Sequence, residues 1–97
     1  MRQVMVRYKV KKKRVAEHEE LLRAVFDELR RSEPSGLRYT AFRLPDGVSF
    51  VHVAFVEGRK NPLDDTKAFA AFTADIEDRC DEPPEPAMLA TVGSYGF

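Results

Sequence analysis

The sequence predicts an α+β fold of the ferredoxin-like type, in the order strand, helix, strand, strand, helix, strand. Stretches of alternating polar and apolar residues flank two stretches with helical spacing, and a turn motif joins the middle two strands. This order places four antiparallel strands in one sheet with both helices on one face. A length of 97 residues fits a single domain spanning residues 1–97.

The first half of the chain holds a strand and a helix. Residues 2–10 alternate in polarity, and the apolar face carries Val4, Val6, Tyr8 and Val10. Residues 11–33 change to helical spacing, with an apolar stripe formed by Leu22, Val25, Phe26 and Leu29. Pro34 and Gly36 end this helix, because proline cannot continue it and glycine accepts a left-handed backbone.

A hairpin and a second helix follow. In the hairpin of residues 37–57, Pro45 presets the turn and Gly47 permits a positive φ. Residues 66–80 have helical spacing, and their apolar stripe ends at Cys80, which we expect to be a buried, inert thiol.

The end of the chain is rich in proline and glycine. Three prolines within residues 81–86 favour extended backbone and predict a stiff connector. Residues 87–97 predict the last strand. Gly93 and Gly96 weaken it and indicate a bend or a bulge.

The composition excludes several classes of protein. Sixteen basic residues cancel sixteen acidic ones, which argues against an obligate nucleic-acid or membrane-surface binder. The single cysteine can form no internal disulfide, which fits a reducing compartment. No apolar run approaches the roughly 20 residues of a membrane span, and the alternating residues 1–10 do not form a signal peptide. We therefore expect a cytoplasmic protein that binds neither nucleic acid nor membrane.

The predicted sheet is apolar on both faces. In the third strand, one face carries Phe50, His52, Ala54 and Val56, and the other carries Val51, Val53 and Phe55. Two helices can cover only one face, and strands that are apolar on both faces are normally buried on both. A second copy of the same sheet, related by a two-fold axis, is the simplest cover. We therefore expect a homodimer.

The strand FVHVAFVE, the helix AFAAFTADIEDRC, the element order and the length resemble the dimeric α/β-barrel superfamily. Within it, the chain is most similar to the antibiotic biosynthesis monooxygenase-like group, over nearly its whole length but in pattern rather than in a short motif. The resemblance implies a dimer whose sheets close a barrel, with a pocket between sheet and helices in each protomer. It also implies an oxidoreductase, since active members include cofactor-independent oxygenases of aromatic molecules and haem-degrading enzymes.

Haem chemistry does not carry over to this chain. The haem-degrading members use an asparagine, a tryptophan and a histidine together, whereas this sequence has no tryptophan. Its only asparagine, Asn61, lies in a predicted loop, and the helix of residues 66–80 contains no histidine. We therefore expect no cofactor. Two scattered histidines, without carboxylates at ligand spacing, predict no metal site.

His52 is the candidate catalytic residue. Neutral imidazole can accept one proton and donate another, so His52 could deprotonate a phenol or orient a bound carbonyl. Phe50 and Ala54 on the same face would leave an apolar space of aromatic size. The alternative is a buried histidine that is bonded to a backbone carbonyl or to a side chain of a partner chain.

Four residues are candidates for substrate binding: Arg7, Tyr39, Phe50 and Tyr8. Arg7 would point into the dimer interior, where it could bind an acidic group of a ligand or form an ion pair between subunits. The two tyrosines could offer phenolic hydrogen bonds to a ligand, or they could be core residues with a solvated hydroxyl. We expect His18 at the surface edge of the first helix.

Three functions follow as hypotheses. The first is a cofactor-free oxygenase or isomerase-like enzyme that acts on a small aromatic or quinone-like molecule, with His52 as base or orienting group. The second is a non-catalytic homodimeric module that binds a small ligand or only assembles. The third is an RNA-binding sheet, for which the glycine pattern and the basic surface are missing.

Overall fold

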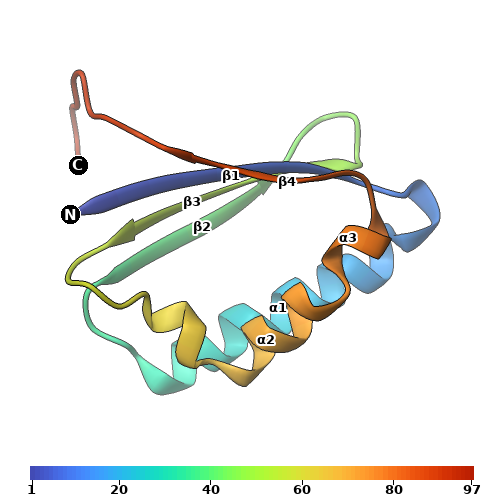
Figure 1. Ribbon diagram of the computed structural model, residues 1–97, viewed down its shortest axis with the longest axis horizontal. Helices are drawn as coiled ribbons and strands as arrows, with labels where there is room; N and C mark the ends of the chain where they lie inside the picture. The colour runs from blue at the N-terminus through green and yellow to red at the C-terminus, as the bar shows by residue number, and fades with distance from the viewer.

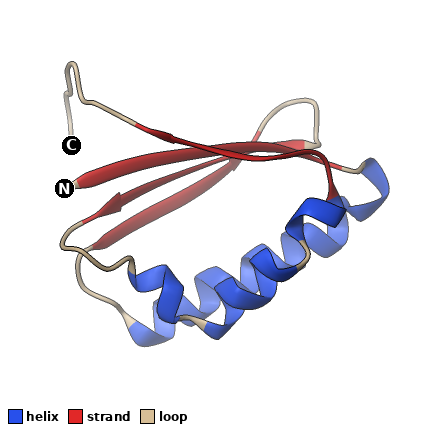
Figure 2. Ribbon diagram, viewed as in Figure 1, coloured by secondary structure: helices blue, strands red, loops and turns tan.

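A four-stranded antiparallel sheet carries the helices on one of its faces (Figures 1 and 2). The computed structural model describes residues 1–97. Its elements are β1 (Arg2–Val10), the 3-10 helix η1 (Lys12–Arg14), α1 (Val15–Ser32), β2 (Leu37–Arg43), β3 (Ser49–Val56), the 3-10 helix η2 (Pro62–Asp65), α2 (Lys67–Ala74), α3 (Ile76–Arg79) and β4 (Cys80–Met88). The strand order is β2-β3-β1-β4. The predicted ferredoxin-like α+β fold is confirmed.

The register of the central strands decides which side chains become neighbours. Tyr8 of β1 pairs with Phe50 of β3, and Val6 pairs with His52. On the other side of β3, Tyr39 of β2 pairs with Ala54. Because alternate residues share a face, three adjacent strands present Tyr8, His52 and Tyr39 to the helices.

The last strand differs from the prediction. β4 contains the proline-rich residues 81–86, which the sequence predicts as a connector, whereas the predicted strand 87–97 loses its ladder beyond Met88. β4 lies at the edge of the sheet and pairs only with β1, with register shifts between Arg7 and Val10. An edge strand tolerates residues that lack a backbone N–H. The extended backbone favoured by proline therefore fits this strand as well as it fits a connector.

The second predicted helix is divided at Asp75 into α2 and α3. Thr66 caps α2, since its Oγ1 accepts a hydrogen bond from the backbone N–H of Phe69 at 3.2 Å. The carboxylate of Glu28 in α1 accepts two further N–H groups of the first turn of α2, at 3.2 and 2.9 Å. Cys80 begins β4 instead of ending the helix, and its thiol is buried as expected.

The hydrophobic core lies between the sheet and the helices. It consists of Tyr8, Val10, Leu22, Val25, Phe50, Leu63, Phe72 and Cys80. The opposite face, which we call the outer face, carries no helix, and its Phe42 is 54% exposed. No helix combines the length and the apolar character that crossing a membrane requires.

Candidate functional site

The structure brings together four of the five predicted site residues. Tyr8, Tyr39, Phe50 and His52 lie on the helix-facing side of the sheet, where all but Tyr39 are buried and Tyr39 is half-buried. Arg7 pairs with Val51 on the outer face and is exposed. The site is therefore built on β1, β2 and β3, without Arg7.

A chain of side-chain hydrogen bonds crosses the core from β2 to α3. Tyr39 Oη contacts His52 Nδ1, and His52 Nε2 lies 2.6 Å from Tyr8 Oη. Tyr8 Oη is also 2.7 Å from Nε2 of His18 in α1. Arg79 Nε, at the end of α3, donates to His18 Nδ1 at 3.2 Å. We call these five residues the polar chain.

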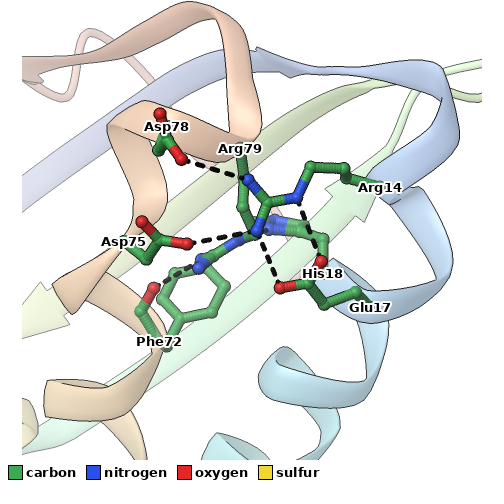
Figure 3. Close-up of polar contacts among 7 residues, drawn as sticks. All are labelled: Arg14, Glu17, His18, Phe72, Asp75, Asp78 and Arg79. Carbon is green, nitrogen blue, oxygen red and sulfur yellow. Dashed lines mark hydrogen bonds and ion pairs between the residues drawn. The ribbon is translucent and has the colours of Figure 1, made fainter.

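Arg79 is a fully buried cation at one end of the polar chain (Figure 3). Its Nη2 donates to the backbone carbonyl of Phe72, and its guanidinium carbon lies 5.3 Å from the centre of the Phe72 ring. No carboxylate pairs with it, because the nearby Glu17, Asp75 and Asp78 pair with Arg14 at 2.9, 3.1 and 3.6 Å. The positive charge therefore faces the ring of His18 without a direct counter-ion.

Burial keeps both histidines neutral at neutral pH. Burial is the main cause that lowers the pKa of His18 to about 4. The charge of Arg79 and the nearby His52 lower this pKa further, and Glu17 raises it by a smaller amount. Burial also lowers the pKa of His52 to about 4. The same loss of solvation raises the pKa values of Tyr8 and Tyr39 well above their usual range. All four groups are thus uncharged hydrogen-bonding groups at pH 7.

Aromatic packing fixes the orientation of the rings in the polar chain. Tyr8 stacks on Phe50 with ring centres 5.6 Å apart, and Tyr39 stacks on Phe26 at 5.1 Å. Phe72 lies 4.9 Å from the ring of His18 and 5.8 Å from that of His52. Since these rings cannot reorient independently, the hydroxyl and imidazole positions are set before any ligand arrives.

A cavity of about 370 Å³ lies between the sheet and the helices and reaches the Tyr39 end of the polar chain. We call it the inner cavity. Its walls are mainly apolar and include Val4, Val6, Ala54, Leu63, Phe69, Phe72 and Ile76. Tyr39 and His52 contribute polar atoms, and Asn61, Thr73 and Glu77 add others. An apolar space lined by a few polar groups has the form and volume of a small-molecule site.

Sequence reasoning missed two members of the polar chain. His18 is fully buried, so its predicted place at the surface edge is wrong. Arg79 is not among the predicted site residues at all. The signal lay in the helical spacing, since His18 precedes Leu22 by one turn and Arg79 follows Ile76 at a three-residue interval. A polar residue that continues an apolar stripe is carried into the core with it.

No group of three or more His, Cys, Asp or Glu side chains is arranged to hold a metal ion. The neutral tyrosine and histidine side chains of the site can form hydrogen bonds and transfer protons.

Several solved structures of other proteins have a similar fold. The chain superposes on a candidate antibiotic biosynthesis monooxygenase from Nitrosomonas europaea with a TM-score of 0.78 at 20% identity, covering 96% of this chain and 100% of that one. A mutant of a cofactor-independent oxygenase from Streptomyces nogalater superposes with a TM-score of 0.72 at 16% identity. The match covers 99% of this chain and 97% of the oxygenase. A candidate antibiotic biosynthesis monooxygenase from Caulobacter crescentus superposes with a TM-score of 0.69 at 21% identity. The match covers 95% of this chain and 90% of that one.

The expected resemblance to the antibiotic biosynthesis monooxygenase-like group is therefore confirmed at the level of the fold. No protein-family model matches the chain, and no curated protein matches its sequence.

Proposed function

We propose that the protein is a cofactor-independent oxygenase that binds a small phenolic or quinone-like aromatic molecule in the inner cavity. The observation that carries this proposal is that Tyr39 and His52 line an apolar cavity of about 370 Å³. A flat aromatic ring fits apolar walls, and the hydroxyl of Tyr39 lies where an oxygen substituent on the ring can reach it. The named activity of the Streptomyces nogalater neighbour agrees with this chemistry.

The reaction that suits these groups starts from a phenol held as its phenolate. The one hydrogen bond that the Tyr39 hydroxyl donates stabilises the negative oxygen in a poorly solvated site, so the ligand loses its proton to solvent more readily. The electron-rich phenolate then reacts with dioxygen at a ring carbon that carries hydrogen. One oxygen atom becomes the new carbonyl and the other leaves as water, so that phenol and dioxygen give quinone and water with four electrons transferred.

In this scheme His52 acts as an orienting group. Its Nδ1 contacts Tyr39 Oη and its Nε2 contacts Tyr8 Oη, so that both ring nitrogens are engaged. An imidazole with a pKa of about 4 is a weak base at neutral pH, which favours orientation of Tyr39 over direct removal of a proton.

Oxygen uptake tests the proposal. The protein is mixed with phenol, 1-naphthol or anthrone, which present one, two and three rings, and oxygen is followed with an electrode while the quinone is followed by absorbance. We expect one dioxygen molecule to be consumed for each quinone formed. For at least one of the larger substrates, oxygen uptake should be faster with the folded protein than with heat-denatured protein. Tyr39→Phe should lower the rate about tenfold or more, since one lost hydrogen bond to a charged oxygen weakens the transition state by that order.

Tyr95→Phe is the matched control. It makes the same chemical change at a tyrosine that is 97% exposed and lies outside the cavity, so the rate should not change. Phenols that bind without oxygen uptake would instead support the alternative function, a non-catalytic module that holds a small ligand. If no phenol binds, the inner cavity is not a ligand site and the proposal is wrong.

We also propose that the protein works as a homodimer. The support is the outer face of the sheet, where Phe42 is 54% exposed and Val51, Val53 and Phe55 are only half-buried. An apolar face of this kind on a single chain is suited to a second sheet. Light scattering during gel filtration should then give twice the chain mass of 11.1 kDa. A monomer at micromolar concentration would contradict the proposal.

A further inference from the structure

The proton positions along the polar chain can be deduced from Arg79. A guanidinium has only N–H donors and no acceptor, so Arg79 Nε must donate to His18 Nδ1. A neutral imidazole carries one proton, so that of His18 is on Nε2 and points to Tyr8 Oη. Tyr8 accepts this bond and directs its own proton to Nε2 of His52.

The series of donors and acceptors continues from His52 to Tyr39 at the inner cavity. Since His52 Nε2 accepts from Tyr8, the ring proton of His52 is on Nδ1 and is donated to Tyr39 Oη. Tyr39 is thereby an acceptor toward the protein, and its hydroxyl proton has no acceptor among the side chains or backbone carbonyls of the chain. Tyr39 also lines the inner cavity. Among the tyrosines and histidines of the polar chain, the one uncommitted donor is therefore the Tyr39 hydroxyl at the cavity.

The reverse order of protons is excluded by Arg79. If Tyr39 donated to His52 Nδ1, His52 would donate from Nε2 to Tyr8, and Tyr8 would donate to His18 Nε2. His18 would then carry its proton on Nδ1, facing the N–H of Arg79. Two donors facing each other in a buried site cannot form a hydrogen bond, and each would lose its partner.

We propose that Arg79 is a positioning residue that fixes the tautomers of both histidines, so that the Tyr39 hydroxyl donates a hydrogen bond into the inner cavity. The cavity thereby selects ligands with an accepting oxygen beside Tyr39. The ligand class is a ketone, a quinone or a phenolate, and a neutral molecule that can only donate is disfavoured. This inference rests on the proposed function only in assigning the inner cavity to a ligand.

The buried charge gives the donor additional strength. All hydrogen bonds of the polar chain run in one direction, from the cation of Arg79 toward the cavity, and aligned hydrogen bonds polarise one another. Arg79 has no carboxylate partner that would cancel its field. A negative oxygen beside Tyr39 is thus stabilised from a distance by a charge that never touches the ligand.

The wild-type tautomers test the inference directly. Long-range proton–nitrogen NMR spectra of the ¹⁵N-labelled protein at pH 7.5 distinguish protonated from unprotonated ring nitrogens. We expect the proton of His18 on Nε2 and that of His52 on Nδ1. A proton on Nε2 of His52 overturns the inference, whatever the protein binds.

Substitution of Arg79 tests whether this residue sets the proton positions on His18 and His52. Arg79→Met removes donor and charge but keeps an unbranched apolar stem that can fill the same space in the core. We expect His52 to show a second tautomer with the proton on Nε2. Arg79→Lys keeps a cationic donor and should restore the single tautomer. If Arg79→Met leaves the His52 tautomer unchanged, Arg79 does not set the order.

The ligand class is tested with 1-tetralone and tetralin, which differ in one carbonyl oxygen. The ratio of their dissociation constants is measured in the wild type and in Tyr39→Phe, so that their different solubilities cancel. One hydrogen bond predicts a ratio that favours the ketone about two- to tenfold more in the wild type. Equal ratios in the two proteins overturn the selection of an accepting oxygen.

Failure of the proposed function gives a different pattern. If 1-tetralone binds but no phenol is oxidised, the inference stands and the oxygenase activity is wrong. If neither probe nor any phenol binds while the tautomers are as expected, the polar chain is a structural network and the inference that it serves a ligand is overturned together with the site.

Discussion

Acid should destabilise this protein well above the pH at which carboxylates titrate. The cause is the pair of buried histidines, whose pKa values of about 4 in the fold compare with 6.5 in the unfolded chain. Between these two values the unfolded chain binds protons that the folded chain does not bind. The free energy of unfolding therefore falls as the pH falls from about 6.5 to about 4, and the histidines contribute no further loss below that.

The size of the effect follows from the two pKa values. At pH 5 an unfolded histidine is almost fully protonated and a folded one is about one-tenth protonated, which costs about 2 kcal/mol for each ring. The two histidines together cost about 4 kcal/mol relative to pH 7.5. Domains of this size are stable by only about 5–15 kcal/mol, so the loss is a large fraction of the total.

Urea denaturation at pH 7.5, 6 and 5 measures this loss, with the unfolding midpoint and slope fitted at each pH. His52→Gln is the informative variant, because it removes one of the two titrating rings and should reduce the loss to about half. A midpoint that does not change between pH 7.5 and pH 5 would refute the reasoning. So would a loss of the same size in His52→Gln.

Three further predictions concern stability and assembly. Tyr8→Phe leaves two buried imidazole nitrogens without their hydroxyl partner and should lower the free energy of unfolding by about 1–3 kcal/mol, measured by urea denaturation; an unchanged midpoint contradicts this. Thr66→Ala removes the cap of α2 and should cost about 1 kcal/mol by the same assay, and a cost near zero would mean that Glu28 alone satisfies the first turn. Phe42→Asp places a charge on the outer face and should halve the mass found by light scattering, whereas a persistent dimer would place the interface elsewhere.

Much of the fold follows from residue periodicity. The alternation in residues 2–10 and the helical stripe around Leu22 place β1 and α1 correctly, and Pro45 with Gly47 marks the turn of the hairpin, where Gly47 has a φ of 79°. These signals are local, since each depends on the residues of one segment and on the period of one element.

The last strand could not be predicted in the same way. The prolines of residues 81–86 favour extended backbone, and whether such a segment is a connector or a strand depends on the strand beside it. That neighbour is β1, about 80 residues earlier in the chain, and only the edge position of β4 leaves room for residues without an N–H.

The members of the polar chain that lie on strands were candidates from the sequence, whereas those that lie on helices were not. Alternation gives the face on which each strand residue lies, so Tyr8 and His52 could each be assigned to an apolar face, whereas the register that pairs Tyr8 with Phe50 and Val6 with His52 is seen only in the fold. His18 and Arg79 reach the same cluster from α1 and α3, and their contact depends on how the helices pack on the sheet. Charge also misleads here, because lysine and arginine are almost never fully buried unless they are paired, whereas Arg79 is fully buried beside a neutral histidine.

The central claim is that the inner cavity, bounded by Tyr39 and His52, is the ligand site. The most direct measurement is a two-dimensional proton–nitrogen NMR titration of the wild-type protein with 1-tetralone, including the imidazole nitrogens. We predict that the largest shifts fall on the ring nitrogens of His52 and on the backbone of Phe69 and Phe72. Largest shifts on the outer face, at Val51, Val53 and Phe55, would contradict this account.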